Sequence, residues 1–396
     1  MNKLKKNIAI LCPCLTNGGA ERAVSNLSRR LSGSANIYLI LFYNRKITYD
    51  YSGTLIQLHF DEKYSKYKKC FLGKLIAKFA YFTVIKEIKS IKKDYKIDAC
   101  VSFLDLLNIY NLISQTGEEV YVSVRNNRSM QNITKLDKAI NICAKLFYKK
   151  ATKVVSLSYG VTDDLVKNFG IPNNKIETIY NHFDIAGMSA KAEKALPESV
   201  KKIIEGKRVI LSMGRFEEQK QFLNLINICA PILSDYDDLI LVIVGRGTLR
   251  NDMLNLINEK DLHDKVVLLD YMQNPMPLIK QSEIFVMNSK YEGLCNSIVE
   301  AMVCGTLTVS RDCKYGPREM IAGITEYESV LNSFQIYDRG LLVPMNNDVE
   351  MEKAIRYSLL HRTELKQLSI NAKNYFSEEF NTHVDQCWKT LLKLDE

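Results

Sequence analysis

The chain has 396 residues, of which 46% are hydrophobic and 25% are charged, and this composition is typical of a soluble globular protein rather than a disordered one. Its length favours two domains over a single core, and no apolar run approaches the roughly 18 residues of a membrane-spanning helix, so we expect a cytoplasmic protein. The formal net charge of +9 is uneven, because residues 1–100 carry a balance of +12 and the remainder a balance of −3.

Short apolar runs alternate with helical patterns in the first half of the chain. The runs predict strands and the patterns predict helices. Repeated alternation of this kind is typical of a parallel sheet covered by helices, so we expect an α/β domain over residues 1–185. The predicted strands are Asn7–Cys12, Ile37–Phe42, Ala99–Phe103, Val120–Val124 and Lys153–Leu157, and the predicted helices are 20–31, 71–93 and 136–149.

Residues 63–96 form a strongly basic segment. They contain 11 Lys against Glu87 and Asp94, and aromatic and aliphatic residues recur among the lysines every three or four positions. This amphipathic pattern is typical of a helix on an anionic membrane surface, and equally of a surface helix that packs on its own domain. No nucleic-acid recognition motif accompanies the charge, so we do not expect a nucleic-acid partner.

The second half repeats the alternation after a polar stretch, 186–206, which we interpret as an interdomain linker. It predicts a second α/β domain over residues 207–372, followed by a terminal helical segment, 373–396. The predicted strands are Arg208–Met213, Leu239–Val244, Val266–Leu269, Ile284–Asn288 and Leu307–Ser310, and the predicted helices are 220–232, 248–259 and 296–304.

Neither a metal nor a cofactor is expected. The ten Cys and five His are scattered, with no Cys-x-x-Cys pair and no cluster with zinc-ligand spacing. The sequence therefore predicts reduced thiols and no metal site.

Two glutamates flank the junction between the strand that begins at Ile284 and the next helix. Glu292 lies in the loop after the strand, and Glu300 lies in the helix that ends at Gly305. Open α/β sheets bind ligands at the carboxyl ends of their strands, and a helix start offers unpaired N–H groups to an anion. The pattern predicts a phosphate site whose carboxylates accept hydrogen bonds from sugar hydroxyls.

This segment resembles the Glu-x7-Glu signature of retaining glycosyltransferases with the GT-B fold, family 4. Here Leu294 and Cys295 replace the usual Phe and Pro. The resemblance covers nearly the whole chain and implies two Rossmann-like parallel-sheet domains facing a cleft. It also implies that the N-terminal domain binds the acceptor, that the C-terminal domain binds a nucleotide sugar, and that the helix at 373–396 crosses back to the N-terminal domain.

Further motifs carry the resemblance and imply the site residues. A Gly-Gly-x-Glu-Arg loop follows the first strand, a Gly-Arg…Gln-Lys segment follows the first strand of the second domain, and a Val-Gly-x-Gly turn follows the next. The resemblance implies that Arg215 and Lys220 grip the donor diphosphate in place of a metal ion. By resemblance the catalytic residues are Glu292, Arg215 and Lys220, and the donor-binding residues are Gly18, Gly19, Gly214, Gly293, Leu294, Cys295, Asn296 and Glu300, the last on the ribose.

Other residues are assigned to the acceptor and the base. Glu21 and Arg22, with Arg125 and Asn126 after a predicted strand, are implied at the sugar or acceptor. Two motifs resemble those of a subgroup of the family that assembles bacterial surface polysaccharides such as O-antigen and capsule. They are the Arg-Asn pair and the segment Tyr315-Gly316-Pro317-Arg318-Glu319. Two interpretations of Arg318 and Glu319 stay open: they belong to the site, or they only cap a helix and form ion pairs. Arg246 and Tyr271 are placed at the rim of the nucleotide base.

The resemblance implies a retaining, metal-independent glycosyltransferase. It is expected to move a hexose or N-acetylhexosamine from a nucleotide diphosphate sugar, UDP-linked, to a polyprenyl-diphosphate-linked oligosaccharide in surface polysaccharide synthesis. The expected place is the inner face of the cell membrane, with an anionic membrane surface as a further partner. Two alternatives stay open: a sugar-nucleotide epimerase of the same architecture, and a non-catalytic membrane-bound scaffold.

Overall fold

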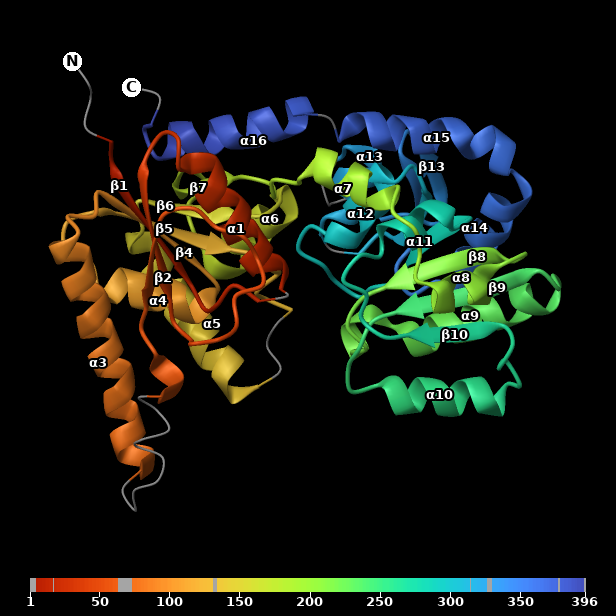
Figure 1. Ribbon diagram of the computed structural model, residues 1–396, viewed down its shortest axis with the longest axis horizontal. Helices are drawn as coiled ribbons and strands as arrows, with labels where there is room; N and C mark the ends of the chain where they lie inside the picture. The colour runs from red at the N-terminus through yellow and green to blue at the C-terminus, as the bar shows by residue number, and fades with distance from the viewer. Residues whose placement is uncertain are drawn as a thin grey trace. The chain divides into compact units, whose positions relative to one another are not determined.

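The computed structural model describes residues 5–16, 18–62, 73–130, 134–313, 315–325, 330–376 and 378–394, with the side chains of 73–81 left aside. Contacts divide the chain into two compact units (Figure 1). The first unit comprises residues 1–183 together with 381–396, and the second comprises residues 184–380. Each unit is a parallel sheet with helices on its faces, which confirms the two α/β domains predicted from the sequence.

The sheet of the first unit has seven strands in the order β3-β2-β1-β4-β5-β6-β7, and every neighbouring pair is parallel. Helices cover both faces, so the central strands are apolar on both sides, and Ile8 to Cys12 are fully buried. The strands are β1 (Asn7–Cys12), β2 (Asn36–Leu41), β3 (Thr54–Gln57), β4 (Ala99–Phe103), β5 (Glu119–Val124), β6 (Lys153–Ser156) and β7 (Ile176–Thr178). The helices of this unit are α1 (Gly19–Leu31), α3 (Gly73–Asp94), α4 (Asp105–Ile113), α5 (Lys135–Phe147), α6 (Tyr159–Phe169) and α16 (Glu378–Leu391), with short 3-10 turns at Tyr148–Lys150 and Asn173–Lys175.

The sheet of the second unit also has seven strands, in the order β10-β9-β8-β11-β12-β14-β13. Its strands are parallel except β13, which pairs antiparallel with β14 at one edge. The strands are β8 (Arg208–Met213), β9 (Leu239–Val244), β10 (Val266–Leu269), β11 (Ile284–Met287), β12 (Leu307–Arg311), β13 (Gln335–Tyr337) and β14 (Gly340–Val343). The helices are α7 (Ile185–Ala192), α8 (Glu198–Ile204), α9 (Phe222–Ser234), α10 (Arg250–Glu259), α11 (Met276–Gln281), α12 (Asn296–Val303), α13 (Pro317–Ala322), α14 (Asp348–Leu360) and α15 (Arg362–Tyr375), with a 3-10 turn at Glu218–Lys220.

Segment 186–206 is not the linker that we expected, because it contains most of α7 and the whole of α8. Asp184 caps α7 by accepting a hydrogen bond from the Gly187 amide. The buried residues Met188 and Ala192 lie on α7, which packs against α11 within the second unit, and Lys280 on α11 pairs with Glu193 at 2.6 Å. The polar composition of this segment reflects its exposed face rather than an extended chain.

The basic segment 63–96 is only partly described. Residues 63–72 and the side chains of 73–81 lie outside the described residues. The later part of α3 packs on the sheet through Val84, Ile88 and Ile91, which are at most 8% exposed. In its described part, this helix therefore packs its apolar face on its own domain, which is the second of the two possibilities that the sequence left open.

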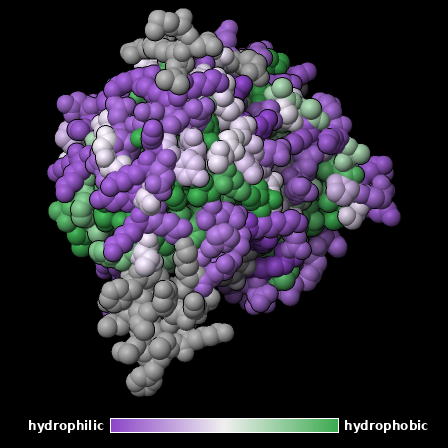
Figure 2. All heavy atoms as spheres, turned by 60° about the vertical axis from the view of Figure 1, so that its left-hand side comes forward, coloured by the Kyte–Doolittle hydropathy of each residue, from purple (hydrophilic) through white to green (hydrophobic). Residues whose placement is uncertain are grey.

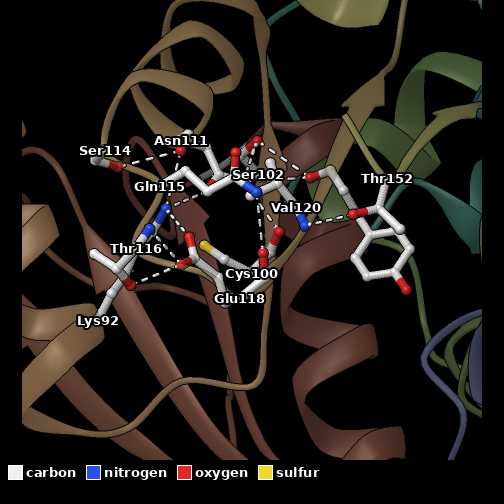
Figure 3. Close-up of polar contacts among 11 residues, drawn as sticks. Lys92, Cys100, Ser102, Asn111, Ser114, Gln115, Thr116, Glu118, Val120 and Thr152 are labelled. Atoms are coloured by element: carbon white, nitrogen blue, oxygen red, sulfur yellow. Dashed lines mark hydrogen bonds and ion pairs between the residues drawn. The ribbon is translucent and has the colours of Figure 1, made fainter. Parts of the chain in front are cut away.

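A buried ion pair holds α3 to the loop before β5 (Figure 3). Lys92 Nζ lies 2.7 Å from Glu118 Oε1, and both side chains are fully buried. The same ammonium group donates to the backbone carbonyl and the side-chain oxygen of Asn111, at 2.9 and 2.7 Å. Asn111 in turn donates to the Cys100 carbonyl at 3.0 Å, so one network joins α3, α4 and the sheet.

Helix α16 completes the first unit. Trp388 stacks on Phe103 with ring centroids 6.5 Å apart, and Tyr121 donates a hydrogen bond to the Leu391 carbonyl at 2.9 Å. Asn381 accepts a hydrogen bond from the Phe183 amide at 3.0 Å. The last residues of the chain thus belong to the same unit as the first.

Candidate functional site

Among the parallel strands the order reverses once in each sheet, between β1 and β4 in the first unit and between β8 and β11 in the second. At such a reversal the loops that leave the two neighbouring strands diverge, which creates a crevice outside their carboxyl ends where ligands bind. In the second unit, Gly214 to Lys220 follow β8 and the segment from Asn288 to Cys295 follows β11. The donor residues predicted in the second unit therefore follow the two strands that flank this reversal.

Lys220 and Glu292 meet across the reversal. Lys220 Nζ lies 2.6 Å from Glu292 Oε1, and the side chains are 14% and 10% exposed. Gly214 lets the lysine pass close to the backbone, because a Cβ atom on Gly214 would lie only 2.9 Å from Lys220 Cε. The structure thus brings Glu292 to Gly214 and Lys220, two predicted site residues more than 70 positions earlier in the sequence.

Two hydrogen bonds join the loops that carry this pair. Gln219 donates its side-chain N–H to the Tyr291 carbonyl at 2.7 Å, and the Lys290 amide donates to the Gln219 carbonyl at 2.8 Å. Gln219 thus uses both its side chain and its backbone on the other loop. We did not assign a role to Gln219 from the sequence, although it lies within the Gln-Lys segment.

A buried arginine that was not predicted from the sequence holds the two loops together through Asn288. Arg311, at the end of β12, donates to Asn288 Oδ1 at 2.7 Å and also pairs with Asp348. Asn288 donates to the Gln221 carbonyl at 3.2 Å. The only sequence signal was an arginine directly after an apolar strand.

The start of α12 lies beside the pair. Cys295 is the N-cap residue, it makes no side-chain capping hydrogen bond, and its φ of 71° is in the left-handed region. A proline cannot adopt this conformation because its ring fixes φ near −65°, so the loop differs from one built on the Phe-Pro of the family pattern. A Cβ atom on Gly316 would lie 2.9 Å from the Leu294 backbone, so the next loop packs tightly on this one.

Other predicted site residues of the second unit make interactions of their own. Glu300 is partly exposed on α12, and its charge adds to burial in raising the pKa of Cys304 to about 12. Arg215 is 69% exposed and pairs with Glu217 at 3.0 Å rather than with Glu292. Arg246 lies over the Tyr271 ring, 5.4 Å from its centroid, so the two residues predicted at the base rim do meet.

Arg318 pairs with Asp312 on the loop after β12, and both side chains are 6% exposed. This is the pairing alternative that the sequence left open for Arg318. Groups of His, Cys, Asp or Glu able to hold a metal ion do not occur among the residues that the structure describes.

In the first unit, the glycine loop follows β1 at the other reversal of strand order. Gly18 is the N-cap of α1, and a Cβ atom there would lie 1.9 Å from Glu21 Oε2, so only a glycine lets this carboxylate fold over the turn. The Arg22 guanidinium lies 5.9 Å from the centroid of the Tyr49 ring. Gly19 begins α1. The four predicted residues of this loop, Gly18, Gly19, Glu21 and Arg22, therefore lie at the N-cap and in the first turn of this helix.

Arg125 and Asn126 differ in burial, since Arg125 is 8% exposed and Asn126 belongs to the exposed residues. The Arg125 guanidinium donates to Ser123 at 3.3 Å and to Asn181, and it lies over Phe103 at 5.4 Å. Burial lowers the pKa of Arg125 to about 9. A small pocket adjoins it, lined by Ala23, Leu27, Arg30, Phe103, Arg125, Tyr180, Asn181, His182, Asp385 and Trp388.

Comparison with known proteins agrees with this arrangement. The profile of the family described as "Glycosyl transferases group 1" matches residues 193–375. Similar in fold is HepE from Anabaena, solved in complex with UDP, with a TM-score of 0.72 and 16% identity over 98% of this chain and 99% of that one.

Two curated relatives come from Campylobacter jejuni. One, named N-acetylgalactosamine-N,N'-diacetylbacillosaminyl-diphospho-undecaprenol 4-alpha-N-acetylgalactosaminyltransferase, is 30% identical over 89% of this chain and 90% of its own length. The other, named as a GalNAc-alpha-(1->4)-GalNAc-alpha-(1->3)-diNAcBac-PP-undecaprenol alpha-1,4-N-acetyl-D-galactosaminyltransferase, is 21% identical over 97% of this chain and 98% of its own length. Similarity at this level along nearly all of both chains shows that the protein belongs to the group 1 glycosyl transferases.

Proposed function

We propose that this glycosyltransferase moves a hexose or N-acetylhexosamine from a UDP-linked sugar to a polyprenyl-diphosphate-linked oligosaccharide, with retention and without a metal ion. The observation that carries the proposal is the Lys220–Glu292 pair, 2.6 Å apart, beside the start of α12 at the reversal of strand order. A cation, a carboxylate and a helix N-terminus at one place suit a phosphate joined to a sugar.

In this proposal Lys220 stabilises the departing nucleoside diphosphate. The leaving phosphate gains negative charge as the glycosidic bond breaks, and a fixed ammonium group in a site shielded from water stabilises that charge without reorganising. Glu292, released from Lys220 as the phosphate arrives, accepts hydrogen bonds from hydroxyl groups of the donor sugar. Arg215 supplies a second cation after turning away from Glu217.

Retention would follow from attack on the same face of the sugar from which the diphosphate departs. The leaving phosphate oxygen takes the proton of the acceptor hydroxyl as the new C–O bond forms and the old one breaks. No protein nucleophile is required, and the proton that the leaving diphosphate gains reduces its negative charge by one.

The choice of donor and acceptor rests on relatives. HepE was solved with UDP, and both Campylobacter relatives are named as transferases that act on undecaprenol-linked sugars. The Arg246–Tyr271 pair offers a flat cationic surface for a base, but it does not distinguish uracil from other bases.

Calorimetric titration of UDP, GDP and ADP in the presence of EDTA tests the donor proposal. We expect UDP alone to bind, binding to weaken at least tenfold in Glu300→Ala, and the exposed control Glu259→Ala to bind as the wild type does. Binding of GDP or ADP instead would overturn the choice of base. No binding by folded protein would favour a non-catalytic scaffold.

The reaction itself is tested by nuclear magnetic resonance of the product formed on a synthetic lipid-diphosphate oligosaccharide. Retention at the anomeric carbon is expected, and an inverted linkage would overturn the mechanism. Release of an epimerised sugar when acceptor is omitted would instead identify an epimerase.

A further inference from the structure

Helix α5 presents large apolar side chains to solvent. Leu136, Ile142 and Leu146 are 65%, 60% and 63% exposed. With 3.6 residues per turn, the three side chains leave the helix within about 120° of its circumference, so they form one stripe. The stripe is notable because the face of the protein drawn in Figure 2 is mostly hydrophilic, with hydrophobic residues gathered in patches between polar ones.

The exposure of this stripe does not come from a loosely attached helix. Thr134 and Asp137 form a reciprocal capping box at the start of α5, with hydrogen bonds of 3.0 and 3.1 Å. The opposite face packs into the first unit through fully buried Ala144, and α5 packs against α4 and α6 (Figure 1). The helix is therefore fixed with an apolar stripe facing outward.

Lysines accompany the stripe along the same segment. Residues 135–150 contain five Lys and a single acidic residue, Asp137, whose carboxylate is engaged in the capping box. All five lysines are exposed, and no ion pair involves them within the described parts of the chain. The ammonium nitrogens of Lys145 and Lys150 lie over the rings of Phe169 and Phe147, at 5.6 and 5.2 Å from the centroids, so positive charge lies directly beside aromatic surface.

We propose that the exposed face of α5 docks on the surface of an anionic lipid bilayer. The three apolar side chains enter the boundary between headgroups and acyl chains, while the lysine ammonium groups remain at the level of the lipid phosphates. Among the described helices, none is long and apolar enough to cross a membrane.

A second copy of this chain is a less suitable occupant, because pairing two α5 faces would bring their lysines together and like charges oppose association. The docking proposal rests on the proposed function for its purpose, since a lipid-linked acceptor lies at a bilayer. Its test requires neither donor nor acceptor, so the two proposals can fail separately. The surface is also distinct from segment 63–96, on which the sequence placed the membrane contact.

Flotation with vesicles of phosphatidylglycerol and phosphatidylcholine, and with phosphatidylcholine alone, tests the proposal. We expect the wild type to bind only the anionic vesicles and to dissociate as NaCl rises from 0.1 to 0.5 M, because salt screens the lysines. The triple variant Leu136→Gln, Ile142→Gln, Leu146→Gln should lose at least tenfold in partition. A matched control replaces Val349 and Leu360, which are 62% and 69% exposed on α14, with Gln. It should bind as the wild type does.

A second set of variants tests the charges. Changing Lys138, Lys145 and Lys149 to Gln should weaken vesicle binding by a similar factor, whereas changing the exposed lysines Lys201, Lys202 and Lys260 to Gln should not. Thermal melts and circular dichroism spectra like those of the wild type would show that the α5 variants are folded. Equal binding by the apolar triple variant and the wild type would overturn the proposal, as would absence of binding by the wild type. A dimer in light scattering that the triple variant abolishes, without vesicle binding, would overturn it in favour of a second copy.

Discussion

Lys220 Nζ and Glu292 Oε1 lie 2.6 Å apart although 72 positions separate the two residues in sequence, and their contact joins the loops that leave β8 and β11. The charges compensate each other in a site that is mostly shielded from water. A partly buried cation can be kept there without a ligand because the carboxylate balances it. A phosphate that arrives therefore exchanges one anionic partner of Lys220 for another.

Replacing Lys220 tests its role in leaving-group stabilisation. If Lys220 stabilises the departing diphosphate, Lys220→Met should lower kcat about 10²- to 10³-fold, the cost typical of removing one group that stabilises developing charge. Steady-state kinetics with donor and acceptor measures the change. Lys290→Met is a suitable control, because Lys290 is a nearby exposed lysine that pairs with Glu218 at 3.5 Å. An equal loss in both variants would argue against a specific role.

Gln219 is predicted to position the Lys220–Glu292 pair rather than to contact the donor. Gln219→Ala removes the 2.7 Å hydrogen bond to the Tyr291 carbonyl, and we expect a loss of about 0.5–1.5 kcal/mol in the free energy of unfolding. The melting temperature of this variant should fall, and its UDP dissociation constant should rise. The exposed Gln367→Ala should change neither. A variant that melts like the wild type and binds UDP normally would refute the positioning role.

Cys295 gives a prediction about the backbone of the donor loop. A non-glycine residue at φ 71° carries strain of roughly 1 kcal/mol that glycine does not. Cys295→Gly should therefore raise the melting temperature slightly or leave it unchanged, whereas Cys295→Pro should destabilise the loop, since proline cannot reach this φ. Thermal melts and UDP titration of both variants provide the measurement. Normal UDP binding by the proline variant would contradict the loop geometry.

The pH dependence of stability follows from the Lys92–Glu118 pair. Burial alone would raise the pKa of Glu118, but the charge of Lys92 and hydrogen bonds from Lys92 and Thr116 outweigh it and hold the pKa below its ordinary value. The carboxylate therefore adds stability that is fully present above the unfolded pKa, about 4.3, and is lost as pH falls through the lower folded pKa.

Glu118→Gln should abolish this part of the pH dependence and should destabilise the protein at neutral pH by about 3–5 kcal/mol, because it leaves Lys92 as a buried unpaired charge. Urea unfolding at pH 7 and at successively lower pH values measures both effects. Replacing the exposed residue Glu205 with Gln provides the control. If the two variants gave the same acid profile, the assignment of the pH dependence to Glu118 would be wrong.

Much of the fold follows from periodicity in the sequence. Strands such as Asn7–Cys12, Arg208–Met213 and Leu239–Val244 have the predicted bounds, because strands buried on both faces are continuous apolar runs. The strands β3, β7, β13 and β14 were not predicted. The first three are short edge strands, where burial is incomplete and the sequence carries little pattern, whereas β14 is fully buried but has only four residues. Helices α4 and α6 were also missed, since each begins soon after a strand without a separate loop signal.

The candidate site was predictable where backbone motifs mark it. Gly214 and Glu292 were identified because glycine turns and strand ends leave a sequence pattern. The support beneath them was not, because the contacts of Arg311 with Asn288 and Asp348 join positions that only the fold brings together. For the same reason the sequence did not indicate that Arg125 turns inward onto Phe103 while Asn126 remains exposed.

The first unit contains residues from both ends of the chain, and this has a consequence for synthesis on the ribosome. Phe103 is covered by Trp388, and Asn381 binds the backbone of Phe183. A nascent chain that has emerged only as far as residue 183 lacks α16, so part of its apolar interior stays open to water. The domain that begins to form first is thus the last to be completed, and a fragment that stops at residue 183 would need residues 381–396, supplied as a peptide or joined through a short tether, to fold to the same state.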